Sequence, residues 1–401
     1  MKVLIVNCVY DPEPIVSAQI GKALAEELAT RGHSVSVIAP FPSRPSGFQF
    51  TSKYVKGKIN LEASRRNLKV FRLPSFICPE SSFFGRLLES MSFGWHSYRY
   101  ILDNSNEIDR VYMNTWPLFG QYGAAAACIK SKIPYFLHIQ DVYPESLTNK
   151  LPTIVRGLMH FALLQIEKYV IRNALRVIVI SEKMGTYIAK TRNVTQNRID
   201  NILNWQDESE FESYKDSWPS DKLAFMYLGN IGPVCGLPNV INSFIDSKID
   251  AKLILAGNGS RKDECIEIAK MHPECDIEFW DVPAGDVAKV QAQAHVLILP
   301  LIKGAASSSI PSKLPAYMFS GRPIIATLDG DSDTANAIRA AACGWVGPAE
   351  DRMWLKGMFV EVSSMHSTSL QKIGQAGRTY ALKLFSKKVN LEKIIHTIVY
   401  G

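Results

Sequence analysis

Short apolar runs alternate with longer amphipathic stretches along almost the whole chain, and this alternation constrains the fold more than any other feature. The first forty residues contain an apolar run at Val3–Asn7, an amphipathic stretch at Ser17–Arg31 and a second apolar run at Val35–Ala39. Apolar residues of the middle stretch recur every four positions, which is typical of a helix with one buried face. Strands that alternate with helices form a parallel sheet covered on both faces. The sequence therefore predicts an α/β fold.

The alternation runs through two halves of the chain. In the first half, further strands are expected at Leu68–Leu73, Arg110–Asn114, Tyr135–Ile139 and Val177–Ser181. The second half follows a polar stretch, Gln206–Lys222, and begins with a strand at Phe225–Leu228 and a glycine turn. Its other strands are expected at Lys252–Ala256, Ile277–Phe279, Val296–Pro300, Pro323–Thr327 and Gly344–Val346, and a last basic helix at about Leu370–Tyr400. Two doubly wound halves of this kind bind a nucleotide-like ligand at the carboxyl ends of their strands.

Positive charge is concentrated in the first half. Residues 1–200 contain 25 Lys or Arg and 15 Asp or Glu, a balance of +10, whereas residues 201–401 contain 20 and 23, a balance of −3. The first half is therefore expected to face an anionic partner, for which a membrane surface, a phosphorylated substrate and nucleic acid are candidates. An ordinary solvated basic face is the alternative.

Other features of the composition bear on location and metal binding. No apolar stretch has the roughly 20 residues that a bilayer span needs. The seven cysteines, an odd number without paired spacing, favour reduced thiols in the cytoplasm. Neither a Cys-x-x-Cys pair nor a histidine-rich cluster suggests a metal site.

The segment Pro300–Ala326, PLIKGAASSSIPSKLPAYMFSGRPIIA, carries the clearest chemical signal. A strand ends at Pro300, a loop of small and hydroxylated residues follows, and a helix is expected from about Ser312. Free backbone N–H groups, the helix dipole and the ammonium groups of Lys303 and Lys313 suit a diphosphate. An ordinary strand–loop–helix crossover is the alternative.

Several segments in this order resemble glycosyltransferase family 4, whose members have the GT-B fold. They include YDPEP, GKALAEELATRGHSVSVIAPFPS, LHIQDVYPES, QIEKYVIRNALRVIVISEKM, YLGNIGPVCGL, LILAGNGS, FWDVP and IPSKLPAYMFSGRPIIA. The likeness spans nearly the whole chain. It is strongest to the bacterial fucosyl- and N-acetylfucosaminyl-transferases of colanic acid, O-antigen and capsule synthesis.

This resemblance implies the architecture and the reaction. Two Rossmann-like domains would face each other across a cleft: an acceptor-binding domain at 1–205 and a nucleotide-sugar-binding domain at 206–380. A helix at 381–401 would return to the first domain. The enzyme would be a retaining, metal-independent transferase without a cofactor, and its co-substrate would be a nucleotide diphosphate-sugar, with UDP favoured over GDP. The resemblance implies a polyprenyl-linked saccharide acceptor at the cytoplasmic face of an anionic membrane, and no nucleic acid.

The donor-site residues implied by the resemblance lie mostly in the second half. The turn around Tyr10–Ala18, with Ser17, would cover the donor diphosphate, although the wider family has a Gly-Gly pair there. The other donor-binding positions are Gly229, Asn230, Gly232, Asp281, Val282, Lys303, Ser308, Ser309, Ser312 and Ala316, with Lys313 as a catalytic cation. Ser308 and Ala316 stand where the family has two glutamates. Asn230 and Cys235 stand where the broader family has Arg and Lys.

The strand Tyr135–Ile139 leads into the expected reaction centre. His138 is expected to bond a sugar hydroxyl or to carry the acceptor's proton, since an ordinary histidine pKa is near 6.5; a strand-end histidine bonded to the backbone is the alternative. Asp141 is preferred as the carboxylate that orients the acceptor, with Glu145 as its alternative. Tyr10, Arg44 and Glu145 are the acceptor-binding candidates that the resemblance implies.

Two further points remain open at this stage. The stretch Leu151–Asn173 is apolar with scattered cations, so it is expected to be either an interfacial surface or a plain core helix. The competing functions are a non-catalytic nucleotide-sugar-binding paralogue or subunit, favoured by Ser308 and Ala316, and a GT-B sugar-nucleotide 2-epimerase.

Overall fold

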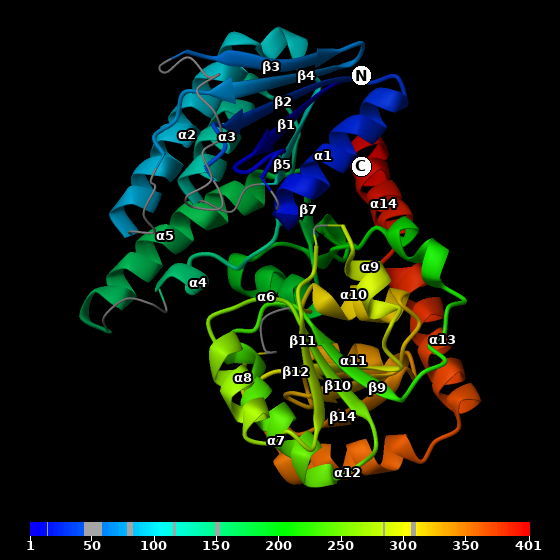
Figure 1. The fold of residues 1–401 in the computed structure, drawn as a ribbon. Helices are drawn as coiled ribbons and strands as arrows, with labels where there is room; N and C mark the ends of the chain where they lie inside the picture. The colour runs from blue at the N-terminus through cyan, green and yellow to red at the C-terminus, as the bar shows by residue number, and fades with distance from the viewer. Residues whose placement is uncertain are drawn as a thin grey trace. The chain divides into compact units, whose positions relative to one another are not determined.

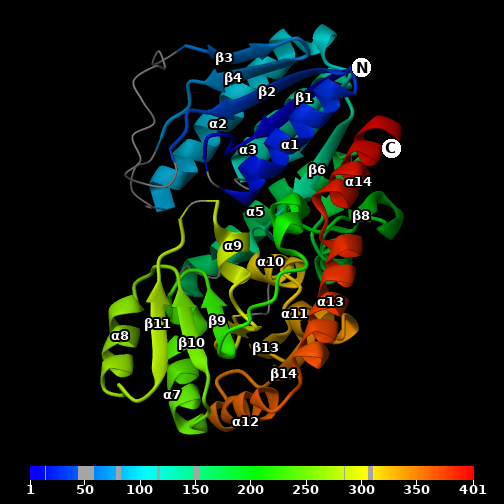
Figure 2. The same ribbon diagram turned by 45° about the vertical axis from the view of Figure 1, so that its right-hand side comes forward.

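The protein is described by a computed structural model of residues 1–401, except Pro14, 44–57, 78–82, 115–117, 149–152, Ala284 and 306–309. The chain divides into two compact units: Met1–Leu203 with Leu391–Gly401, called unit 1, and Asn204–Asn390, called unit 2. Each unit contains a largely parallel sheet with helices on its faces (Figures 1 and 2). The predicted α/β class is therefore confirmed.

Unit 1 is built on an eight-stranded sheet in the order β3-β4-β2-β1-β5-β6-β7-β8. Its strands are β1 (Lys2–Asn7), β2 (Ser34–Pro40), β3 (Asn60–Arg65), β4 (Leu68–Leu73), β5 (Arg110–Asn114), β6 (Tyr135–Ile139), β7 (Arg176–Val179) and β8 (Ile199–Asn201). Its helices are α1 (Val16–Thr30), α2 (Phe83–Asp103), α3 (Leu118–Ser131), α4 (Glu145–Thr148), α5 (Thr153–Asn173) and α6 (Glu182–Arg192). All strand pairs are parallel except β3 with β4. The apolar runs of β1 and β6 are buried, as a sheet covered on both faces requires.

Unit 2 contains a six-stranded parallel sheet in the order β11-β10-β9-β12-β13-β14. The strands are β9 (Ala224–Leu228), β10 (Lys252–Ala256), β11 (Asp276–Trp280), β12 (Val296–Pro300), β13 (Ile324–Thr327) and β14 (Gly344–Gly347). The helices are α7 (Leu237–Ser247), α8 (Lys262–Lys270), α9 (Val287–Gln291), α10 (Lys313–Phe319), α11 (Asp333–Ala340), α12 (Arg352–Ser363) and α13 (Ser367–Leu384). From β9 the chain continues to β10 and β11 on one side, and β12 lies on the other side. A topological switch point therefore lies between β9 and β12.

The structure differs from the sequence-based expectation in its edge strands and in its last helix. The short edge strand β8 was not predicted. β3, the antiparallel edge strand, was not predicted, because its sequence NLEASR is mostly polar. The last helix was predicted as one, but it is two: α13 ends at Leu384 and α14 covers Lys387–Tyr400. The side-chain amide of Asn390 donates to the carbonyl of Leu384 at 2.7 Å and so supports the break. Helix α14 begins in unit 2 and ends in unit 1.

Candidate functional site

The switch point of unit 2 holds Lys313, the first residue of α10. Its ammonium donates a hydrogen bond to the phenol oxygen of Tyr227 and lies 3.6 Å from the sulfur of Cys235. The ammonium also lies 4.3 Å from the centroid of the Tyr227 ring, which is cation–π geometry. Burial lowers the pKa of Lys313 below that of an ordinary lysine. The lysine is therefore held beside the end of β9 rather than extended into water.

The glycine turn after β9 makes room for this lysine. Gly229 has φ +148°, and a Cβ at this position would lie 2.2 Å from Cε of Lys313. The hydroxyl of Tyr227 donates to the carbonyl oxygen of Asn230 at 2.5 Å, which fixes the next residue of the turn. At Gly232, a Cβ would lie 2.9 Å from the side-chain nitrogen of Asn230. The structure thus brings together four of the predicted residues: Gly229, Asn230, Gly232 and Lys313.

The helix that carries Lys313 is anchored one turn later. Tyr317 is fully buried, and its hydroxyl accepts from the N–H of Leu228 at 2.8 Å and lies 3.0 Å from the carbonyl oxygen of the same residue. Lys313 and Tyr317 are four residues apart, so they share one face of the helix. Both side chains thus attach α10 to the end of β9 and fix the position of the ammonium.

The other predicted donor-site residues follow the carboxyl ends of neighbouring strands. Asp281 is exposed after β11, where Lys262 forms an ion pair with it at 2.9 Å and lowers the pKa of its carboxyl. Lys303 is exposed after β12, and its N–H donates to a carboxylate oxygen of Glu350 at 3.3 Å. Val282 is half-buried, Ser312 is exposed and Ala316 is buried; Ser308 and Ser309 lie outside the described residues.

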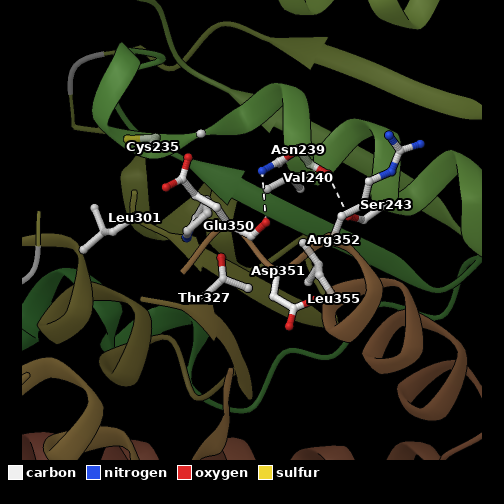
Figure 3. A pocket seen from close by; sticks show the side chains of 12 residues that line it. Cys235, Asn239, Val240, Ser243, Leu301, Thr327, Glu350, Asp351, Arg352 and Leu355 are labelled. Atoms are coloured by element: carbon white, nitrogen blue, oxygen red, sulfur yellow. Dashed lines mark hydrogen bonds between the residues drawn. The ribbon is translucent and has the colours of Figure 1, made fainter. Parts of the chain in front are cut away.

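A small pocket lies next to these loops. It lies between the start of α7 and the start of α12, and its lining includes Cys235, Asn239, Leu301 and Glu350 (Figure 3). The side-chain amide of Asn239 donates to the carbonyl of Glu350 at 3.3 Å across it. Its volume of about 10 Å³ holds one water molecule at most. This pocket is therefore too small for a nucleotide or a sugar.

In unit 1, His138 is enclosed by its neighbours. Its Nδ1 lies 2.6 Å from the phenol oxygen of Tyr112, and its Nε2 lies 2.8 Å from the amide nitrogen of Gln140. The side chain is almost fully buried, and this burial lowers its pKa to about 3. The expectation of a pKa near 6.5 is therefore wrong. His138 is neutral at pH 7 and holds Gln140 at the end of β6, so it is not suited to carry the acceptor's proton.

Glu145 belongs to an ion-pair network. The guanidinium of Arg192 donates to both carboxylate oxygens of Glu145, at 2.7 and 2.8 Å, and to Glu167 at 2.6 Å. Arg192 also donates to the carbonyl of Tyr143. Burial alone would raise the pKa of Glu145, but hydrogen bonds from Arg192 and Tyr187 outweigh it and hold this pKa below its usual range. The carboxylate of Glu145 is thus already bound by the chain and fixes the loop after β6.

Asp141 and the turn after β1 complete the predicted positions in unit 1. Asp141 is exposed directly after Gln140, and its Oδ1 accepts from the N–H of Val142 at 2.9 Å. Tyr10 is buried, with the guanidinium of Arg72 5.8 Å from its ring centroid. Ser17 is buried near the start of α1. Arg44 lies outside the described residues.

Two asparagines at strand ends fix the start of α1, and sequence reasoning missed them. Asn7 and Asn114 end the adjacent strands β1 and β5, where they are paired in register. Their side-chain amides donate to the carbonyl oxygen of Ser17, at 3.4 and 3.2 Å. A buried polar residue at the end of an apolar run is a signal that the sequence contained. The roles of Tyr227 and Arg192 carried no such local signal.

Comparison with known proteins matches both halves of the chain. Residues 22–210 match the sequence family described as Glycosyltransferase Family 4, and residues 224–356 match Glycosyl transferases group 1. These matches and the two α/β units identify the chain as a glycosyltransferase with the GT-B fold, which confirms the predicted architecture class.

Individual relatives agree with this assignment. The putative colanic acid biosynthesis glycosyl transferase WcaI of Escherichia coli (strain K12) is 24% identical over 99% of this chain and 100% of its own length. A glycosyltransferase structure from Rickettsia africae ESF-5 has a TM-score of 0.70 at 13% identity, covering 100% of this chain and 99% of that one. The Anabaena Alr3699/HepE structure in complex with UDP has a TM-score of 0.67 at 14% identity, covering 99% of both chains. At these identities the structures show a shared fold.

Proposed function

We propose that this glycosyltransferase moves a sugar from a nucleotide diphosphate-sugar, with UDP favoured over GDP, to a polyprenyl-diphosphate-linked saccharide. The reaction would retain the configuration of the sugar and contribute to a bacterial surface polysaccharide such as an O antigen or a capsule. It would take place at the cytoplasmic face of the membrane. The name of the Escherichia coli relative and the UDP held by the Anabaena structure support the polysaccharide and the donor.

The observation that carries the proposal is the position of Lys313. Its ammonium is held by Tyr227 beside the glycine turn at the switch point of unit 2, where open α/β sheets bind their ligands. Negative charge develops on the diphosphate as it leaves the sugar. A cation that is already in place stabilises that charge without reorganisation during the reaction.

The remaining roles are assigned by position. Asp281 and Val282 would meet the nucleobase, and Lys303 would add positive charge near the phosphates. Ser17, in the first turn of α1 that the paired asparagines hold, would contact the diphosphate. Asp141 would orient the acceptor hydroxyl, since Glu145 is neutralised by Arg192. The proposed transfer would use no enzyme nucleophile, and holding the donor and the acceptor in reacting geometry would lower its barrier.

A second candidate is a nucleotide-sugar-binding protein without turnover. Ala316 favours it, because a buried methyl group cannot accept a hydrogen bond from the ribose in place of the expected glutamate. The deciding experiment incubates UDP- and GDP-sugars with and without a lipid-linked acceptor and measures nucleotide release and product. Nucleotide release that requires the acceptor supports transfer, and the anomeric configuration of the product tests retention. Donor binding without release would favour the second candidate, and conversion without acceptor would favour an epimerase.

A further inference from the structure

The exposed face of α2 is apolar where a helix on a sheet normally presents polar residues. Phe84, Leu88, Met91 and Trp95 are between 49% and 75% exposed. Between residues 84 and 98 these four are the exposed positions of the helix, and the next exposed residue is Arg99. Their spacing of four, three and four residues places them in one stripe on the outside of the helix. Core packing does not explain this stripe, because it points away from the sheet.

Two neighbouring helices extend the apolar surface. Helix α3 contacts both α2 and α5 in unit 1 (Figure 1). On α5, Leu158 and Phe161 are 77% and 63% exposed. Tyr122 of α3 and Tyr169 of α5 are also exposed, and their ring centroids lie 5.8 Å apart. We call the surface formed by these exposed apolar side chains of α2, α3 and α5 the α2–α5 face.

Cations border this face. Lys130 of α3 lies 6.0 Å above the ring of Tyr98, which stacks on Trp95 with centroids 6.2 Å apart. Arg99 continues the α2 stripe, and Arg156 and Arg172 are exposed near the two ends of α5. The acidic Glu89 of α2 is paired with Arg86 at 2.7 Å. Aromatic and aliphatic groups with positive charge around them match an anionic lipid surface, where aromatic rings occupy the headgroup level.

We propose that the α2–α5 face docks on an anionic lipid bilayer, with the α2 stripe inserted among the headgroups. A second copy of the chain would bring the same cations against each other, whereas acidic lipids would neutralise them. The sequence left Leu151–Asn173 open between an interfacial surface and a core helix. The exposed Leu158 and Phe161 favour the surface, and the structure adds α2 as the main apolar stripe. The proposal deepens the proposed function by naming the surface that brings the enzyme to a lipid-linked acceptor. The test uses neither donor nor acceptor, so its result does not depend on whether the proposed reaction is correct.

The test is vesicle co-sedimentation of the full chain. We expect binding to vesicles with about 30% acidic phospholipid, weaker binding as salt rises, and little binding to neutral vesicles. The double variant Leu88→Gln/Trp95→Gln should bind at least about tenfold more weakly, because it removes two inserted apolar groups. Its matched control is Met271→Gln/Met353→Gln, which changes two residues of unit 2 that are 68% and 72% exposed. For charge, Arg99→Gln is compared with Lys372→Gln on α13.

The folded state of each variant is checked by thermal unfolding, which should not change because the altered side chains are exposed. Equal loss of binding in the α2 variant and its control would overturn the proposal, as would equal binding to acidic and neutral vesicles. Sedimentation velocity tests whether a second copy of the chain binds this face instead of a bilayer. A wild-type dimer that the α2 variant abolishes would show that the face binds a second copy instead.

Discussion

The ammonium of Lys313 hydrogen-bonds the phenol oxygen of Tyr227 and lies 4.3 Å from the centroid of its ring. These residues are 86 positions apart in the sequence. Their contact joins the start of α10 to β9 and gives the candidate donor site a fixed cation.

Replacing Lys313 should therefore reduce catalysis more than stability. Lys313→Ala and Lys313→Met should each lower kcat/KM by roughly 30- to 1,000-fold, about 2–4 kcal/mol of transition-state stabilisation. The methionine variant retains most of the packing against Gly229 and Tyr227, so it separates the loss of charge from the loss of contacts. Steady-state kinetics and thermal unfolding check the two effects. Full kcat/KM in either variant would place the diphosphate elsewhere.

Turnover should not require a divalent metal. Asp329, Asp331 and Asp333 follow β13 with alternating spacing, which resembles a metal-binding motif. Both carboxylate oxygens of Asp329, however, accept from the N–H of Gly304, at 2.8 and 3.1 Å. Among the residues that the structure describes, no three acidic, histidine or cysteine side chains converge as a metal site would require. Activity in excess chelator should stay within about twofold of the untreated enzyme, and loss restored by Mg²⁺ or Mn²⁺ would contradict this.

The burial of His138 predicts a specific loss of stability in acid. Its pKa is about 3 in the folded chain and near 6.5 when unfolded. Its contribution to stability is therefore fully present above pH 6.5 and is lost progressively as pH falls toward 3. Between pH 7 and pH 5 the loss should be about 2 kcal/mol, since one pKa unit corresponds to about 1.4 kcal/mol.

Comparison with His138→Gln isolates this effect from other titrating groups. The free energy of unfolding of unit 1, from urea-dependent hydrogen exchange of β6 amides, should fall less steeply with acid in the variant. Identical pH dependence in the two proteins would show that His138 titrates normally.

Removing the cation of the Arg192 network should lower the free energy of unfolding much more than removing one of its acids. Arg192→Met leaves the carboxyl groups of Glu145 and Glu167 without their partner and should cost about 3–5 kcal/mol. Burial raises the pKa of Glu167, and the neighbouring Arg192 opposes this rise. In Glu167→Gln the arginine keeps both of its bonds to Glu145, so this variant should cost less, about 1 kcal/mol. Urea unfolding of unit 1 checks both, and similar costs for the two variants would contradict the assignment.

Local sequence patterns were sufficient for the class of fold. A strand buried on both faces needs a continuous apolar run, and β1, β6, β9 and β12 each have one. The helix between β1 and β2 showed its periodicity, and the predicted strands agree with the observed ones to within two residues at each end. β3 was missed because a polar edge strand has neither a continuous apolar run nor a helical periodicity. The break between α13 and α14 was missed because it is supported by side-chain bonds from Asn390 and from Glu208, which is distant in the sequence.

Side-chain environments depended on strand order and packing, which local patterns do not contain. The local sequence does not distinguish His138 from a histidine that titrates in solution. Tyr112 on the adjacent strand β5 and the surrounding core keep its side chain neutral. Glu145 meets Arg192, 47 residues away, only because α6 follows the neighbouring strand β7. The apolar stripe of α2 likewise has the periodicity of a core-facing helix. Periodicity defines a stripe, and only the packing of α2 against α3 decides that this one faces outward.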